Sequence, residues 1–270
     1  MNSAKLRERL KSLQEKKKGG GGNKNFFKSP TDGSKAMIRQ CPYPHNEDNM
    51  PFIEVGWHYN IAGHRSLVCP RETYNEPCPI CELADEFKSM GGKDNWQIFK
   101  KLSAKMRIYS PVIVRGDEGS GVKLWGYGST IYELLLEKYL DSEWGNLSDP
   151  MTGRDLKVWT IKAASKDEFD DPRMDVSPNV SKMMEKKVDI ANILKEIPNF
   201  LEDGETFEAK SFTELKAIVA KFADPDGEQN NDFETPSSNK TSFDDDEDSS
   251  TDDESSLDQE LENLLGNKKG

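Results

Sequence analysis

The stretch around which the chain is organised reads His58-x10-Cys69-x8-Cys78-Pro79-Ile80-Cys81. Zinc prefers four soft or borderline ligands in a tetrahedron, and two cysteines separated by two residues reach one ion from a single turn. Four protein ligands would leave no open position for water, which is the mark of a structural metal. The pattern therefore predicts one structural Zn2+.

The fourth ligand is chosen between His58 and His64 by strand geometry. A turn after Ile61 would place Ile61 opposite His64 and His58 opposite Leu67 in an antiparallel hairpin. Because side chains alternate between the two faces, Cys69 then shares a face with His58. A slip of one residue would exchange the two histidines, so the prediction of His58 depends on this register.

The remaining histidine and cysteine are weaker candidates for metal binding. His45 lies in a Pro-rich loop, and Cys41 ends an apolar stretch typical of a buried strand. A disulfide framework is the alternative for the cysteines. The charged N-terminus, from Lys5 onwards, contains no secretory signal, and three clustered cysteines favour metal binding in a reducing cytosol.

Charge divides the chain into three parts. The first 24 residues hold 8 basic and 2 acidic side chains, whereas residues 224–270 hold 16 acidic and 3 basic ones, a net charge of −13. We predict a flexible basic arm over 1–22, a core over 23–223 and a disordered acidic tail over 224–270, whose composition cannot bury a core. Both ends carry leucines at helical spacing, at Leu6-x3-Leu10-x2-Leu13 and at Leu257-x3-Leu261-x2-Leu264-Leu265.

The core has the pattern of a mainly β fold with some α (α+β). Apolar runs predict strands, and spacings of three and four residues predict helices. The zinc subdomain, at about 56–92, interrupts the early strands, so we expect a five-stranded barrel of the oligonucleotide-binding (OB) type with an insertion. Prolines at 172, 178 and 198 make residues 165–223 irregular, apart from a final helix. The expected strands are 35–41, 51–61, 64–69, 105–115, 122–127 and 155–164, and the expected helices start at 79, 94, 130 and 212.

Aromatic and basic residues interleave in the middle of the core, as on surfaces that stack bases on rings and follow phosphates with cations. The alternative for each ring is a place in the hydrophobic core. Alternation of residues 105, 107 and 109 along one strand favours a shared exposed surface. The candidates are Tyr74, Trp96, Phe99, Lys100, Lys101, Lys105, Arg107, Tyr109, Arg115, Trp125 and Tyr127.

Enzymatic and membrane functions have little support. The chain has no Walker-type Gly-rich loop, no Gly-x-Ser-x-Gly and no His-Glu-x-x-His motif. Its carboxylates are concentrated in a tail that cannot preorganise a site, and no apolar run is long enough to span a bilayer. We expect a soluble protein that is not an enzyme.

The chain resembles the single-stranded DNA-binding (helix-destabilising) proteins of T-even-like phages. The resemblance rests on the basic arm, the strands at 36–39, 51–52 and 109–115, the Cys78-Pro79-Ile80-Cys81 knuckle after Tyr74, and the acidic Ser-rich tail. It implies an OB-fold with an inserted zinc subdomain, His58 as a zinc ligand, and DNA in a basic cleft between the two parts. The positions that match the family's DNA contacts are Arg39, Tyr74, Phe99, Lys105, Tyr109, Trp125 and Phe169.

The resemblance also implies cooperative, sequence-independent coating of single-stranded DNA in phage replication, recombination and repair. The protein would act in the cytoplasm of the infected bacterial host. The arm would dock on a neighbouring copy of the chain, and the tail would compete for the cleft and recruit phage replication and recombination proteins. The residues expected to lie between protomers are Lys5, Arg7, Arg9 and Lys11. In this chain they are spread along a helix, whereas the family's arm carries a compact cluster.

Two other functions fit parts of the same pattern. Clefts that stack bases often accept RNA, so a zinc-containing RNA-binding translational regulator is the alternative. An acidic adaptor whose zinc module binds protein is a third possibility, and it predicts no binding of nucleic acid once the tail is removed.

Overall fold

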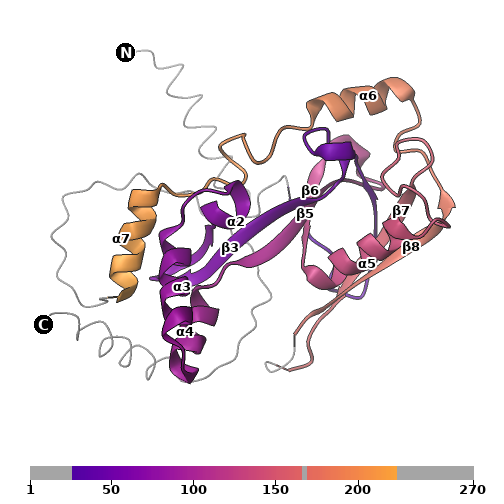
Figure 1. Ribbon diagram of the computed structural model, residues 1–270. Helices are drawn as coiled ribbons and strands as arrows, with labels where there is room; N and C mark the ends of the chain where they lie inside the picture. The colour runs from indigo at the N-terminus through magenta and orange to yellow at the C-terminus, as the bar shows by residue number, and fades with distance from the viewer. Residues whose placement is uncertain (1–25, 166–168, 224–270) are drawn as a thin grey trace, which may run out of the picture.

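The computed structural model describes residues 26–165 and 169–223. It is an α+β fold built on one eight-stranded sheet (Figure 1), in which β1 is parallel to β6 and the other pairs are antiparallel. The strands are β1 (Phe26–Phe27), β2 (Ala36–Gln40), β3 (Ile53–Ile61), β4 (His64–Val68), β5 (Lys105–Val114), β6 (Lys123–Tyr127), β7 (Arg154–Ile161) and β8 (Asp171–Val180). The helices are α2 (Pro70–Tyr74), α3 (Pro79–Met90), α4 (Lys93–Leu102), α5 (Ser129–Leu140), α6 (Lys187–Glu196) and α7 (Phe212–Ala223), with short 3-10 turns η1 (Glu47–Asn49) and η2 (Glu118–Ser120).

Strand β5 connects the two ends of the molecule. Its first half pairs with β3, its second half pairs with β2, and its other edge pairs with β6. Pro111 lies between the β3-paired and the β2-paired residues, where the missing N–H costs no ladder hydrogen bond to either strand. Figure 1 shows β3 and β5 running from the helices α3, α4 and α7 at one end to α5, β7 and β8 at the other.

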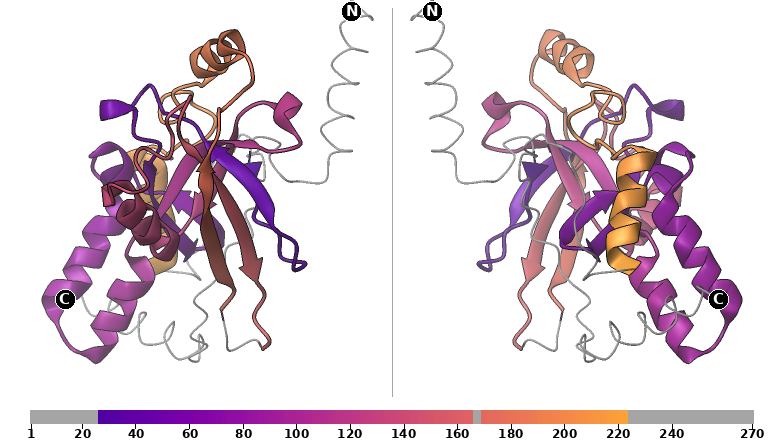
Figure 2. Two further views of the ribbon diagram at one scale, coloured as in Figure 1. Left: turned by 90° about the vertical axis from the view of Figure 1, so that its right-hand side faces the viewer. Right: turned by 90° about the vertical axis from the view of Figure 1, so that its left-hand side faces the viewer.

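The first end is a helical lobe made of β4, α2, α3, α4 and α7. The first four elements are inserted between β3 and β5, as the sequence predicts, but α7 arrives from the end of the core. Figure 2 shows α7 beside α3 and α4. Leu215 and Ile218 of α7 pack in one cluster with Ile80 and Phe87 of α3, so a distant segment completes the lobe.

The opposite end contains a strand that the sequence analysis missed. Residues 171–180 form β8, although Pro172 and Pro178 led us to expect irregular chain. Strand β8 lies at the end of the sheet path and pairs only with β7 among the described residues, so each proline needs no partner on its outer side. Pro178 also falls at the irregularity in the pairing between residues 154 and 156. The six expected strands are therefore eight, because β1 and β8 were not expected.

Residues after β8 cover the centre of the sheet. Phe200 and Phe207 join Tyr43, Trp57 and Tyr109 in one buried cluster. The Tyr43 hydroxyl donates to the Asn199 side chain at 3.1 Å, and the Phe200 N–H donates to the same hydroxyl at 3.0 Å. This part of the chain, like helix α6, is held in place by contacts with residues that are distant in the sequence. No helix within 26–165 and 169–223 combines the length and the apolar character needed to cross a membrane.

Candidate metal centre and nucleic-acid surface

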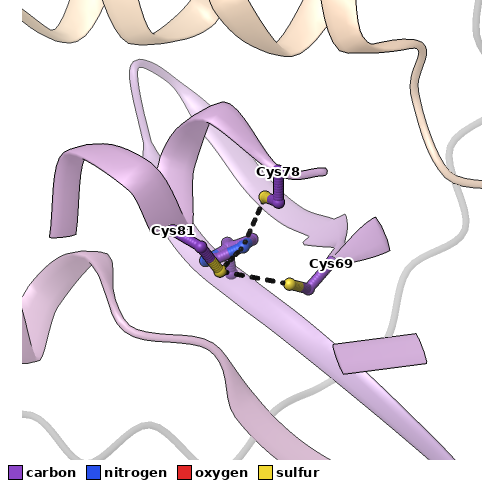
Figure 3. A group of neighbouring side chains, drawn as sticks. Cys69, Cys78 and Cys81 are labelled. Atoms are coloured by element: carbon purple, nitrogen blue, oxygen red, sulfur yellow. Dashed lines mark hydrogen bonds between the residues drawn. The ribbon is translucent and has the colours of Figure 1, made fainter. Parts of the chain in front are cut away.

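The four predicted zinc ligands gather at one buried point. The ligand atoms of His58, Cys69, Cys78 and Cys81 all lie within 4.8 Å of one another, and each residue is at most 1% exposed. Figure 3 shows the three cysteines pointing toward one another, Cys69 from the start of α2 and Cys78 and Cys81 from the start of α3. Three thiols and one imidazole match the donor set and the number of a closed zinc site. The cluster could therefore hold a metal ion, and its ligands fit zinc.

The β3–β4 hairpin selects His58 through its register. His58 pairs with Leu67 and Ile61 pairs with His64, as predicted, so His58 and Cys69 share a face. His64 is only half-buried on the other face, where burial and then the charges of two lysines lower its pKa. A one-residue difference in register would have placed the wrong imidazole in the cluster.

The cysteines occupy helix starts, where a short turn fixes their direction. Cys69 is the N-cap of α2 and its Sγ accepts from the Glu72 N–H at 3.4 Å. Cys78 is the N-cap of α3, and Cys81 lies in the first turn of that helix. Pro79 is at the first helical position, which needs no intrahelical N–H. Local sequence therefore builds three of the four ligand positions.

A second contact fixes the ring of His58. Its Nδ1 lies 2.8 Å from the Leu102 carbonyl, which can only accept, so Nδ1 carries the proton. Nε2 then presents its lone pair toward the Sγ atoms of Cys78 at 3.4 Å and Cys81 at 3.6 Å. Metal-binding histidines are commonly oriented in this way. Hydrogen bonds with Cys69 and Cys81 lower the pKa of the Cys78 thiol, which favours the thiolate that binds metal.

The remaining candidates lie elsewhere. Cys41 is fully buried, and burial raises the pKa of its thiol to about 12, as expected of a cysteine that acts as a small apolar residue. The Nε2 atom of His45 lies 3.0 Å from the Ile197 carbonyl. Neither residue belongs to the metal cluster.

Helix α4 presents aromatic and basic side chains to solvent. Trp96 is 48% exposed, and its ring lies 5.0 Å from that of the half-buried Phe99. Lys100 is exposed one helical turn from Trp96, and the Lys88 ammonium of α3 lies 5.1 Å from the Phe99 ring. Rings and cations therefore occupy one face of the lobe. Lys88 was missed in the sequence because its distance from Phe99 depends on how α3 packs against α4.

The cationic surface continues into the start of β5. Lys105 is exposed and Arg107 is half-buried, two residues apart on the same strand face. Lys101 lies elsewhere on α4, with its ammonium 5.7 Å from the Phe222 ring of α7. Phe169, in the turn before β8, is 52% exposed. Both views in Figure 2 show the β7–β8 hairpin and the α3–α4 hairpin projecting in the same direction.

Three predicted rings lie in the core, which corrects the expectation that they are exposed. Tyr109, Trp125 and Tyr127 are 2–4% exposed. The Tyr109 ring packs on Gly126, where a Cβ would lie 2.7 Å from it, and under Phe207 at 4.7 Å. The Trp125 Nε1 donates to the Ser29 hydroxyl at 3.2 Å, and the Tyr127 and Ser110 hydroxyls are 2.7 Å apart. Along this face of β5, Lys105 is exposed and Arg107 is half-buried, whereas Tyr109 is buried because β6 and the segment before α7 cover it.

Two predicted arginines and Tyr74 make internal contacts. Arg39 is fully buried and donates to the carbonyls of Asp149 at 2.6 Å and Ser181 at 2.9 Å. Arg115 pairs with Asp155 at 2.8 Å and also donates to backbone carbonyls. The Tyr74 hydroxyl donates to the Phe207 carbonyl at 2.5 Å. These side chains join segments of the fold, and the surface proposed below is built without them.

The basic arm and the acidic tail lie outside the described residues. This includes the four positions expected between protomers, Lys5, Arg7, Arg9 and Lys11. Their roles remain predictions.

Comparison with known proteins identifies the family. A search of curated proteins finds no match to this chain. A family model described as gp32 DNA binding protein like matches residues 32–223, which includes the metal cluster, α4 and most of the sheet. Because this match covers well over half of the 270 residues, the chain belongs to the gp32-like DNA-binding protein family.

Proposed function

We propose that the protein coats single-stranded DNA cooperatively and without regard to sequence. The observation that carries this proposal is the exposed Trp96 beside the half-buried Phe99 on α4, flanked by Lys88 and Lys100. Aromatic rings stack on any base, and each stacked base contributes about 1–3 kcal/mol. Membership of a DNA-binding family supports the same function.

The proposed DNA surface combines these residues with the start of β5 and the tip of the β7–β8 hairpin. Cations follow the phosphates and rings take the bases, so no base-specific hydrogen bonds are needed. The surface consists of Lys88, Trp96, Phe99, Lys100, Lys105, Arg107 and Phe169.

The metal would be one structural Zn2+ that holds the helical lobe together. Bound there, zinc would link β3, the end of β4 and the start of α3 by coordination bonds. Since α4 packs against α3, the site would fix the position of the proposed DNA surface. We also propose that β2, β3, β5, β6 and β7 correspond to the strands of an OB-type core, which family membership supports.

We assign a function to each end of the chain from its charge. The basic arm, with Lys5, Arg7, Arg9 and Lys11, would bind a neighbouring copy and produce cooperativity. The tail, with its net charge of −13 over 224–270, would compete for the cationic surface and recruit phage replication and recombination proteins. The protein would then serve replication, recombination and repair in the cytoplasm of the infected host.

Tryptophan fluorescence of residues 1–223, titrated with an oligothymidine at two salt concentrations, tests the central proposal. We expect strong quenching at low salt that weakens steeply at high salt, because phosphate contacts release counterions. No binding at low salt, with zinc present, would refute DNA coating and favour the adaptor alternative. Tighter binding of a matched RNA oligomer would favour the translational regulator.

The exposed ring is tested separately with Trp96→Ala, using a labelled oligomer and fluorescence anisotropy. Loss of one stacked base predicts an affinity roughly 5- to 150-fold lower. Phe212→Ala is the matched control, because Phe212 is 45% exposed but lies on α7. Equal effects of the two substitutions would show that α4 is not the stacking surface.

A further inference from the structure

A groove at the other end of the molecule has no part in the proposed DNA surface. It lies between α5 and the sheet formed by β2, β7 and β8, and has a volume of about 480 Å³. Figure 1 shows α5 beside β7 and β8, at the end opposite to α3, α4 and α7. This size falls within the range of sites that bind ligands or short peptide segments.

The walls of the groove are apolar. They are formed by Met37, Leu134, Trp144, Met174 and Val176. Leu134 is 37% exposed, and the other four are half-buried. Trp144, Met174 and Val176 pack against the core beneath α5. Apolar side chains that line a concave surface, instead of being scattered singly, mark a place where another apolar surface binds.

The groove is preformed, because Trp144 is held in place. The Lys138 ammonium lies 4.9 Å from the Trp144 ring, and the Arg154 guanidinium lies 5.2 Å from it. Arg154 also donates to the Trp144 carbonyl at 3.2 Å and to the carbonyl of Pro178 in β8. A ring fixed from two strands and a helix loses little freedom when a partner binds.

The charges at the groove favour an acidic partner. Lys138 and Lys157 line it, and neither forms an ion pair with another residue of 26–165 or 169–223. Asp175 is the one acidic residue in the lining, and Arg154 adds a further positive charge beside Trp144. An apolar segment flanked by carboxylates therefore fits both the walls and the rim.

We propose that this groove binds the chain's own segment Leu257–Leu265, in the same chain or in a neighbouring copy. Leu257, Leu261, Leu264 and Leu265 are spaced to form one face of a helix, and Asp258, Glu260 and Glu262 lie between them. Amphipathic helices bind apolar grooves through residues at this spacing. The basic leucine-rich segment near the N-terminus has the wrong charge for a lysine-lined rim.

The length of the chain permits this contact. Residues 224–256 separate α7 from the segment, and a flexible linker of that length has a root-mean-square span of roughly 30 Å, with a far longer maximum. The acidic stretch at 244–254 would then be tethered at both ends, to α7 in the helical lobe and to the groove. This inference goes beyond DNA binding and can be tested without DNA.

Methionine methyl groups report directly on the groove. Met37 and Met174 line it, whereas Met90 and Met106, which are 50% and 40% exposed, lie in the helical lobe and at the start of β5. Methyl NMR spectra of full-length protein labelled at methionine are compared with those of Leu261→Asp/Leu264→Asp. We expect the Met37 and Met174 signals to change and those of Met90 and Met106 to stay. These substitutions leave every contact among the described residues in place.

Charge is tested by adding a peptide of residues 255–267 to the Leu261→Asp/Leu264→Asp protein. The peptide should restore the Met37 and Met174 shifts, and Lys138→Glu/Lys157→Glu should weaken its binding roughly tenfold. Lys195→Glu/Lys216→Glu, a matched change at two exposed lysines, should not. Sedimentation at two concentrations separates binding within one chain from binding between copies.

Two results would overturn the proposal. One is that the Met37 and Met174 signals of full-length protein equal those of the Leu261→Asp/Leu264→Asp variant. The other is that Met90 and Met106 change instead, which would place the segment against the proposed DNA surface. Failure of DNA binding would leave this result untouched, so the two proposals stand or fall separately.

Discussion

Substitution of Arg39 distinguishes a role in DNA binding from a role in folding. The resemblance places Arg39 among DNA contacts, whereas the structure buries it completely. We expect Arg39→Met, which keeps most of the packing, to lower the free energy of unfolding by about 3–5 kcal/mol. The Ser181 carbonyl and hydroxyl both lose a charged donor.

The structure also limits the size of this effect. The Asp149 carbonyl keeps the Gly153 N–H at 2.9 Å, and Asp155 keeps Arg115 at 2.8 Å, so neither acceptor is left alone. This places the expected loss near the lower end of the range. Gly153 lies directly against the guanidinium, because a Cβ there would lie 2.6 Å from the Arg39 Nη2.

Urea unfolding measures stability, and oligothymidine binding well below the melting temperature measures DNA affinity. We expect a lower midpoint and near-normal affinity for Arg39→Met, and the reverse for Lys105→Ala at an exposed position. If Arg39→Met left the stability unchanged and reduced the DNA affinity tenfold or more, a structural role for Arg39 would be refuted.

Three further predictions follow from the cluster, the cationic surface and the start of α7. Cys81→Ser should abolish the binding of one zinc per chain, measured by metal analysis, and loosen the helical lobe in hydrogen exchange, whereas Cys41→Ser should retain the zinc. Lys105→Ala should reduce the slope of log affinity against log salt by about 0.7, and an unchanged slope would remove Lys105 from the phosphate contacts. Ser211→Ala should lower the free energy of unfolding by about 1 kcal/mol, because Ser211 and Glu214 cap α7 reciprocally. Hydrogen bonds from Ser211 lower the pKa of Glu214, so its contribution is present above the ordinary value of 4.5 and is lost as the pH falls through the lowered pKa. Urea midpoints across pH 3–6 should show this dependence in the parent and a weaker one in the variant, which keeps the backbone N–H of position 211 as a donor to Glu214.

The metal cluster was predictable because its geometry is mostly local. The Cys78–Cys81 spacing places two thiols at one helix start, and a tight hairpin fixes which histidine shares a face with Cys69. Helix α3 was predictable for the same reason, since its apolar positions recur at helical spacing. Nothing in these arguments requires knowledge of distant segments.

The accessibility of the rings was not predictable in this way. Tyr109 alternates with Lys105 and Arg107 along one strand, yet only the two basic residues reach solvent. Phe207, almost a hundred residues later in the chain, covers the Tyr109 ring. Strand β8 was missed for a related reason. A proline in a strand loses a ladder hydrogen bond only if its N–H would face a neighbouring strand, and the order of the strands is a property of the whole sheet.

The sequence by itself determined the ligand set of the metal cluster, the helices α3, α4 and α7 of the lobe, the mixed α+β class and the separation of charge between the two ends. All of these depend on residue type and short spacing. The tertiary structure alone decided that Arg39 is internal, that Trp96 rather than Trp125 is exposed, and that α5 and β8 enclose a groove. Whether a side chain is buried depends on segments that meet only after folding. The same residue type can lie in the core or at the surface, and its tertiary neighbours decide which.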